Sequence, residues 1–308
     1  MTVLPTDPAG PHDPAQTDLV VIGSRDGLAA AINPLGAELW WLRDGAGNDL
    51  QWDGDARVWN GRAPILFPFV GTLRDGHYRA EGAEHAMARH GFARRMLFEV
   101  VAHTTTSASF RLAADAATRG AYPFEFALIL TFTVDGNALT VAARIENPGD
   151  APLPASFGFH PALRWPLVAG APRAGHTITF DADEPQPIHR LDAAGLLAGA
   201  RPSPIVDCVL DLHDDLFTDD AILLLGLNSR GVIYGAPTGP QIRVTFENLP
   251  DLGIWTKPGG GYICIEPWHG YSDPAGFTGD VFDKPGIIAI AAGGVWEGQM
   301  TIALEPGG

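Results

Sequence analysis

The feature of this sequence that most restricts its fold is the recurrence of β-strand patterns separated by turn residues. In the clearest example, two apolar runs at residues 124–134 and 138–145 flank the turn sequence Asp-Gly-Asn. Aliphatic and aromatic residues favour strands, and an Asp-Gly step between two such runs favours a tight hairpin turn. The segment therefore predicts an antiparallel β-hairpin.

Similar apolar runs recur along the rest of the chain. They span residues 28–32, 37–42, 50–52, 98–103, 108–113, 176–180, 221–225, 231–235, 241–247, 252–257, 261–266 and 299–304. No long apolar stripe has helical spacing, and only residues 118–121 and 192–200 suggest a turn or two of helix. We predict a mainly β protein, a large antiparallel β-sandwich with few short helices. A sheet of so many strands curls or splits, which leaves a concave face as a natural binding cleft.

The composition supports one large folded unit behind a short tail. Residues 1–16 are rich in Pro, Asp and Gly and lack the charged start and apolar stretch of a signal peptide, so we expect a flexible tail. No linker or repeat divides residues 17–308, which we predict to be a single domain. With 46% hydrophobic and 18% charged residues, the chain can bury a large core.

The overall charge and the two cysteines restrict the location and the partners. A formal net charge of −16 argues against a nucleic-acid or anionic-membrane surface. No stretch approaches the ~20 apolar residues that a bilayer-spanning helix needs, so we expect a cytoplasmic protein. Cys208 and Cys264 have room for one disulfide, but the apolar strand around Cys264 favours a buried free thiol.

Three ionisable residues stand in unusually apolar surroundings. Glu266 lies within Tyr-Ile-Cys-Ile-Glu-Pro-Trp, His160 within Ser-Phe-Gly-Phe-His-Pro, and His90 within Arg-His-Gly-Phe-Ala-Arg. A charged group in such a setting is costly unless it has partners or a function. The alternatives are a carboxylate capped by backbone amides, a core histidine bonded to a carbonyl, and an exposed loop histidine. We favour an acid–base site assembled from distant parts of the chain.

Five segments together resemble the aldose 1-epimerase (galactose mutarotase-like) family, and most of all its bacterial branch of proteins often described only as aldose epimerases. They are residues 60–71, 90–94, 156–161, 216–221 and 254–268, in the family's order. The resemblance runs from about residue 20 to the C-terminus. It implies a galactose mutarotase-like supersandwich with a sugar cleft on its concave face. It also implies interconversion of the α and β anomers of a free monosaccharide, without a cofactor.

The resemblance also implies roles for single residues. His160 is expected to be the general acid and Glu266 the general base of ring opening, and ordinary pKa values near ~6.5 and ~4.3 suit that division. His90 is expected to donate a hydrogen bond near the ring oxygen. Arg62 is expected to bind sugar hydroxyls or to hold Glu266, and the alternative is an ion pair with Asp53 or Asp55.

Three further residues are candidates for sugar contacts. Asp220 is preferred slightly over its neighbour Asp219, because adjacent strand residues face opposite sides, and turn chemistry is the alternative for both. Trp255 and Trp268 offer aromatic faces for the apolar side of a pyranose, and core packing is an equally good interpretation.

Metal and nucleotide chemistry receive little support. His85 and His90 lack a third ligand at a suitable spacing, so we expect no metal. Residues 69–76 lack the Gly-Lys-Ser/Thr sequence of a phosphate-binding loop.

Three functions remain in competition at this point. The first is anomer interconversion of a neutral aldose. The second is the same reaction on a hexose 6-phosphate, which needs cationic side chains converging at the cleft rim. Candidates for that rim are Arg62, Arg74, Arg89, Arg94 and Arg95. The third is a non-catalytic sugar-binding module on the same scaffold, since a fold does not determine function. A two-carboxylate glycosidase is a weaker rival, because no second acid has a matching context. The sequence leaves the sugar and the oligomeric state open.

Overall fold

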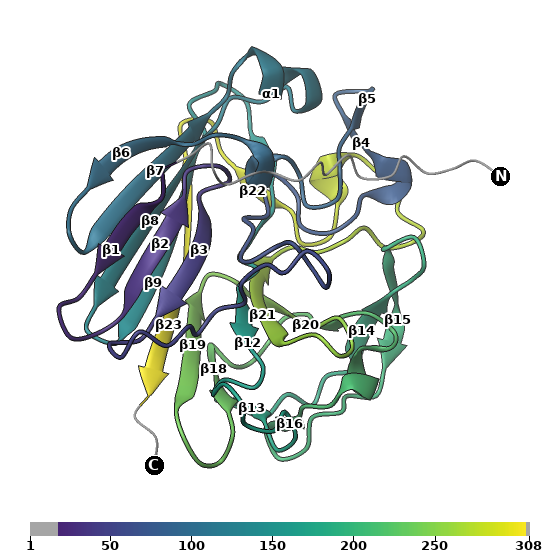
Figure 1. The fold of residues 1–308 in the computed structure, drawn as a ribbon. Helices are drawn as coiled ribbons and strands as arrows, with labels where there is room; N and C mark the ends of the chain where they lie inside the picture. Colours follow the sequence, from purple (N-terminus) through teal and green to yellow (C-terminus); the bar gives the residue numbers. More distant parts are fainter. Residues whose placement is uncertain (1–17, 306–308) are drawn as a thin grey trace.

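The described chain, residues 18–305 of a computed structural model, is built around two large antiparallel β-sheets (Figure 1). The expected tail, residues 1–16, lies outside the described residues. In spatial order, the nine-stranded sheet contains β16 (Val209–Asp211), β13 (Thr177–Phe180), β18 (Gly231–Gly235), β19 (Gln241–Glu247), β23 (Val295–Glu305), β9 (Ala138–Glu146), β8 (Ala127–Asp135), β7 (Ser107–Ala113) and β6 (Glu99–His103). The seven-stranded sheet contains β11 (Phe157–Gly158), β21 (Tyr262–His269), β20 (Asp251–Trp255), β17 (Ile222–Leu224), β14 (Ile188–Leu191) and β15 (Leu197–Arg201), and β12 (Ala162–Arg164) also pairs with β21. The predicted mainly β, antiparallel sandwich is confirmed.

Smaller elements complete the described part of the fold. They are the sheet of β1 (Val20–Gly23), β2 (Ala29–Asn33) and β3 (Glu38–Arg43), the pairs β4 (His77–Ala80) with β5 (Ala83–Ala86) and β10 (Leu153–Ala155) with β22 (Ile288–Ile290), the helix α1 (Ala116–Ala121), and four short 3₁₀ turns, η2 (Arg74–Gly76), η3 (Ala93–Arg95), η4 (Asp214–Phe217) and η5 (Val281–Asp283). That residues 17–308 form one domain remains a prediction.

The β8–β9 hairpin confirms the strongest strand prediction. The two strands pair without a shift from Ala127 opposite Glu146 to Asp135 opposite Ala138, so the loop between them has two residues. Gly136 in that loop has φ of 54°, a conformation that suits glycine.

One helical prediction is confirmed and the other is wrong. Helix α1 covers the first segment and begins with a capping box between Asp115 and Thr118. Residues 192–200 form a hairpin connection and most of β15 instead. The Asp192 carboxylate accepts hydrogen bonds from the backbone amides of Ala194 and Leu196, at 2.8 and 3.0 Å. This Asx turn reverses the direction of the chain, so that β15 runs antiparallel to β14. A helix at the same place would have carried the chain away from β14.

The main hydrophobic core lies between the two large sheets. It includes Leu130 and Val141 from the nine-stranded sheet and Ile263 and Ile265 from β21 of the other. Side chains of a strand alternate between its two faces. The residues between these isoleucines therefore face away from the main core. Cys264 lies on that outer face of β21 as a buried free thiol, as predicted.

Candidate active site

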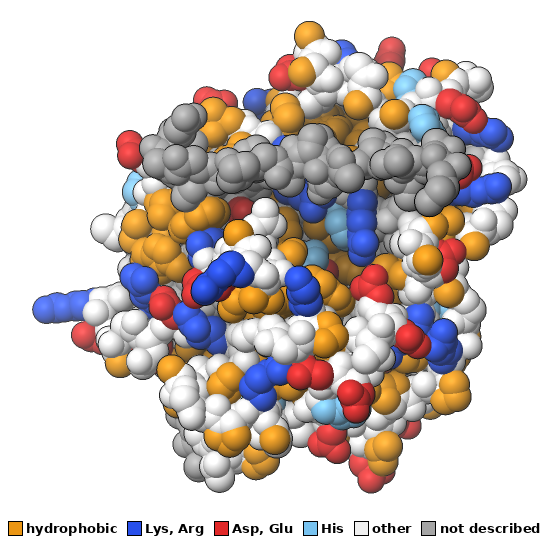
Figure 2. All heavy atoms as spheres, turned by 45° about the vertical axis from the view of Figure 1, so that its right-hand side comes forward, with side chains coloured by type: hydrophobic (Ala, Val, Ile, Leu, Met, Phe, Trp, Pro, Cys, Tyr) orange, Lys and Arg blue, Asp and Glu red, His pale blue; other side chains and the backbone are white. Residues whose placement is uncertain are grey.

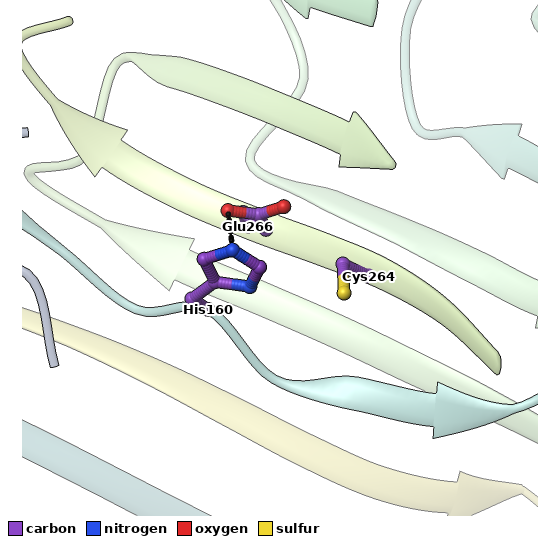
Figure 3. A group of neighbouring side chains, drawn as sticks. All are labelled: His160, Cys264 and Glu266. Carbon is purple, nitrogen blue, oxygen red and sulfur yellow. Dashed lines mark ion pairs between the residues drawn. The ribbon is translucent and has the colours of Figure 1, made fainter. Parts of the chain in front are cut away.

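His160 and Glu266 meet across neighbouring strands. Strands β11 and β12 both pair with β21 in one register, with Gly158 opposite Trp268 and Ala162 opposite Cys264. Continuing that register through the gap between β11 and β12 places His160 opposite Glu266. The Nε2 atom of His160 lies 3.3 Å from Oε2 of Glu266, as drawn by the dashed line in Figure 3. Two side chains more than a hundred residues apart in the sequence thus form one pair.

The pair is almost completely withdrawn from water. The His160 side chain is 10% exposed and the Glu266 side chain 3% exposed. Burial lowers the pKa of His160 to about 3. Burial also raises the pKa of Glu266 well above its usual value, and the charge of Arg89 opposes this rise. Both shifts favour the uncharged forms. Burial therefore works against a charged ion pair at this position.

An aromatic wall encloses the imidazole of His160. Trp59 stacks on it with ring centroids 5.2 Å apart and an interplanar angle of 23°, and Trp255 presents an edge at 6.2 Å. Tyr262 stacks on Trp59 at 5.3 Å and lies tilted against Trp255 at 5.6 Å. The prediction had included Trp255 but had missed Trp59. The sequence places Trp59 in a loop directly before the first family-like segment, where no periodic pattern distinguishes it.

The second histidine, His90, is held by a backbone exchange with Gly71. The amide of His90 donates to the Gly71 carbonyl at 2.8 Å, and the amide of Gly71 donates to Nδ1 of His90 at 3.1 Å. His90 itself has φ of 66°, a strained conformation for a non-glycine residue of the kind often retained at functional sites. Its ring lies 6.0 Å from that of His160. The structure therefore brings together His90, His160 and Glu266.

Residues 66–71 connect the two histidine segments. Leu66 pairs with Gly158, and Phe67 pairs with Gly91. The Ser156 hydroxyl accepts a hydrogen bond from the Val70 amide at 2.8 Å. This one segment thus positions the backbone next to His160 on one side and next to His90 on the other. Its apolar sequence is explained by this buried, connecting position.

Arg89 is the cation that acts on all three of these ionisable groups. Its charge lowers the pKa values of His90, His160 and Glu266, in each case as a smaller effect than burial. Its Nε atom lies 3.1 Å from Nε2 of His90. The sequence had placed Arg89 only in a group of five candidate rim arginines.

Asp219 and Asp220 face different surroundings. Asp219 is exposed and pairs with Arg201 at 2.8 Å. Asp220 is half-buried, has φ of 67°, and accepts a hydrogen bond from the Ala221 amide at 2.8 Å. Its charge also raises the pKa of Glu266, which is an electrostatic link to the site. The slight preference for Asp220 as a sugar ligand remains a prediction.

Arg62 has contacts on the neighbouring sheet. Its guanidinium lies over the Trp40 ring at 4.2 Å and donates to the Trp40 carbonyl at 3.2 Å. Its amide donates to the buried carboxyl of Glu38 at 2.9 Å. The side chain of Arg62 therefore contacts β3, while its carbonyl accepts from the Ala162 amide of β12 at 2.9 Å. Its role in sugar binding remains a prediction.

Trp268 lies on the same face of β21 as Glu266. Its ring fills the space that Gly253 leaves, since a Cβ there would lie 2.6 Å from the ring. It packs with Leu66, Val70 and Leu223, and its indole Nε1 is buried with no hydrogen-bond partner within residues 18–305. The packing of Trp268 indicates a structural role. Its unpaired indole N–H is also a donor that a hydroxyl group of a bound molecule can use.

His160, Cys264 and Glu266 form a compact group of potential ligands (Figure 3). Their ligating atoms lie within 4.8 Å of one another, and all three residues are buried. Imidazole, thiol and carboxylate are the donors that zinc prefers. Burial, however, raises the pKa of Cys264 well above its usual value, so a thiolate there is unfavourable. The short contact between His160 and Glu266 suits proton transfer between these two residues.

A hollow on the molecular surface has a composition that matches this site. Figure 2 shows histidine and apolar side chains within the hollow and Lys or Arg side chains at its edge. A separate cavity of about 220 Å³ lies elsewhere, between β4, β5 and the loop before β22, and its walls include Arg79, Phe277 and Lys284. We place the chemistry at the pair of His160 and Glu266, because neither residue lines that cavity.

No helix of residues 18–305 is long and apolar enough to cross a membrane.

Comparisons with known proteins identify similar sequences and similar folds. The family model for aldose 1-epimerase matches residues 18–286. The chromosomally encoded protein LacX of Lactococcus lactis subsp. lactis is 30% identical over 274 residues, which cover 85% of this chain and 92% of LacX. The crystal structure of a galactose mutarotase related enzyme from Lactobacillus acidophilus has a TM-score of 0.87 at 26% identity, covering 94% of this chain and 97% of that one. A galactose mutarotase-like protein from Lactobacillus casei has a TM-score of 0.86 at 26% identity, covering 94% and 100%.

Proposed function

The chain belongs to the aldose 1-epimerase family, and from this membership we propose that it interconverts the α and β anomers of a free aldose. The observation that carries the proposal is the buried pair of His160 and Glu266, 3.3 Å apart, in which burial lowers the pKa of His160 and raises that of Glu266. Ring opening moves one proton off the C1 hydroxyl and another onto the ring oxygen. A pair that holds one proton and has one free acceptor can do both.

In the proposed reaction Glu266 removes the proton from the C1 hydroxyl while His160 delivers a proton to the ring oxygen. The C1–O bond to the ring oxygen breaks as the C1 carbonyl forms. The carbonyl turns about the C1–C2 bond, and closure runs the same steps in reverse with the proton roles exchanged. Burial favours the uncharged forms of both residues in the empty site, so in this proposal the proton of the pair lies on His160 once the sugar is bound. The total number of protons on the pair stays the same through this step.

The remaining predicted residues would bind and orient the sugar. His90 would donate to the ring oxygen, and Asp220 would accept from a hydroxyl. Trp255, at the edge of His160, would cover an apolar face of the ring. Arg62 and Trp268 remain candidates for hydroxyl contacts. We propose no cofactor, and the cytoplasmic location remains a prediction.

The proposal is tested by anomer equilibration, measured by NMR on purified protein with several aldoses. The wild type is expected to accelerate equilibration above the buffer rate. Glu266→Gln and His160→Ala are each expected to lower kcat/KM by ~10²–10⁴-fold, the usual contribution of a general acid or base. Half-buried His85 on β5 lies outside the pair, so His85→Ala is the matched control. Sugar binding in calorimetry with no acceleration in the wild type would reject the enzyme in favour of a binding module.

A further inference from the structure

Three consecutive backbone amides, those of residues 70–72, each donate to a side chain from a distant part of the chain. The acceptors are the Ser156 hydroxyl for Val70 at 2.8 Å, Nδ1 of His90 for Gly71 at 3.1 Å and the Ser272 hydroxyl for Thr72 at 3.0 Å. Both serines are buried, at 0% and 3% exposed. Two serine hydroxyls therefore hold the segment on either side of its contact with His90.

Ser272 acts on the same peptide group as His90. The peptide bond between Gly71 and Thr72 carries the carbonyl that accepts from the His90 amide at 2.8 Å, and it also carries the amide that donates to Ser272. A peptide group is planar, so a hydrogen bond at one end fixes the direction of the other end. Gly71 has φ of 77°, and a Cβ there would overlap the Ser272 hydroxyl. The serine is therefore packed directly against the backbone that holds His90.

The two ends of the segment are also held by backbone hydrogen bonds. The Ser156 amide donates to the Pro68 carbonyl at 2.8 Å, while the Ser156 hydroxyl accepts from Val70. At the other end, the Asp273 amide donates to the Thr72 carbonyl at 2.9 Å. The central peptide groups therefore have fixed neighbours on both sides.

We propose that Ser272 is a positioning residue for the imidazole of His90, acting through the peptide group between Gly71 and Thr72, and that Ser156 has the same role at the other end. This inference rests on the proposed function, in which His90 contacts the ring oxygen of the sugar. His90 has φ of 66°, a conformation that its surroundings must maintain. Without the Ser272 hydroxyl, the Thr72 amide loses its acceptor and the peptide group turns towards another one.

The test compares Ser272→Ala with a matched control, Ser229→Ala. Ser229 is 1% exposed, and its hydroxyl also accepts a backbone amide at 3.0 Å, that of Ala182 after β13. The control therefore removes the same type of buried hydrogen bond from another part of the fold. Both variants should lower the midpoint of urea denaturation by similar amounts, so that a difference in activity does not reflect stability alone.

Activity is measured as kcat/KM for anomer equilibration of glucose by NMR, after subtraction of the buffer rate. Ser272→Ala should lower kcat/KM about 5- to 50-fold, since a misplacement of ~1 Å at a reacting centre can cost about 10²-fold. Ser229→Ala should leave kcat/KM unchanged. In a His90→Ala protein, adding Ser272→Ala should change kcat/KM by less than about twofold, because the residue through which Ser272 acts is already gone.

A second measurement needs neither sugar nor turnover. The NMR signals of the His90 imidazole are identified by their loss in His90→Ala. In the sugar-free protein these signals should shift in Ser272→Ala and keep their wild-type positions in Ser229→Ala.

The inference is overturned if Ser272→Ala lowers kcat/KM no more than Ser229→Ala does, or by the same factor with and without His90. Unchanged imidazole signals of His90 in Ser272→Ala would also overturn it. If the wild type does not accelerate equilibration of any aldose, the proposed function fails, and the imidazole signals alone decide the inference. If Ser272→Ala does not fold, Ser156→Ala takes its place under the same criteria.

Discussion

Lowering the pH from 7 to 5 is expected to leave kcat/KM for the preferred aldose almost unchanged. The reason is the burial of His160, which lowers its pKa to about 3. The active form carries one proton on the pair with Glu266. As the pH falls, a second proton can be added only by charging the buried imidazole, and that step becomes favourable only near pH 3. The acid limit of activity therefore lies well below the ordinary histidine pKa.

The size of the effect follows from the two pKa values. For a histidine with an unperturbed pKa of ~6.5, the neutral fraction falls about 25-fold between pH 7 and pH 5. With a pKa of about 3, more than ~95% of the imidazole stays neutral over the same range. The profile of kcat/KM is the relevant one, because it reports the ionisations of the free enzyme. The two cases differ by more than an order of magnitude at pH 5.

A substitution at Trp59 is expected to give the enzyme the pH dependence of an ordinary histidine. Trp59 stacks on His160 and helps to keep water from the ring. In Trp59→Ala the pKa of His160 is expected to rise towards 6.5, so the loss of kcat/KM at pH 5 should appear. Trp41→Ala, which removes a half-buried indole on β3, is the control and should keep the wild-type profile.

Polarimetry or NMR at each pH gives the rates, with the buffer-catalysed rate subtracted and circular dichroism used to check that the protein is folded. A wild-type kcat/KM that falls with an apparent pKa between 6 and 7 would refute the reasoning. It would mean that the imidazole is hydrated in the working enzyme and titrates freely.

Two further predictions concern stability and are measured by urea denaturation. Lys284 and Asp273 form a buried ion pair at 2.8 Å, with side chains 1% and 4% exposed, so Lys284→Met should cost about 3–5 kcal/mol by leaving a buried carboxylate without its partner. A loss below about 1 kcal/mol would show that the carboxylate is neutralised or hydrated instead. Gly91 has φ of +71°, and a Cβ there would overlap the carbonyl of Phe67, so Gly91→Ala should cost at least about 2 kcal/mol. Gly76 has the same φ with nothing within 4 Å, and Gly76→Ala should cost less; equal losses would contradict a contribution from the overlap.

Local chemistry explains why some elements were predictable. The β8–β9 hairpin was found because its alternation and its turn residues act within about twenty consecutive residues. Residues 192–200 were predicted wrongly because their composition permits a short helix. The hydrogen bonds of the Asp192 side chain decided in favour of a turn.

The residues of the candidate site also form two groups, those that the sequence identifies and those that only the folded chain identifies. Glu266, His160 and His90 stand out in the sequence because a titratable group in an apolar strand is costly without a purpose. Trp59 lacks such a signal, since a tryptophan in a loop has many ordinary explanations. Arg89 and Arg62 are also equivalent in the sequence, and only the folded chain separates them. Arg62 is stacked on Trp40, whereas Arg89 lies at His90.

The amino-acid sequence by itself determined a mainly β protein, the family resemblance and the residues that are expensive to bury. These properties depend on composition, periodicity and short motifs, which are local. The tertiary structure decided that His160 lies opposite Glu266, because the register of β11 and β12 on β21 is set by long-range pairing. It also decided which arginine reaches the site, since the position of a long side chain depends on neighbours that are distant in the sequence.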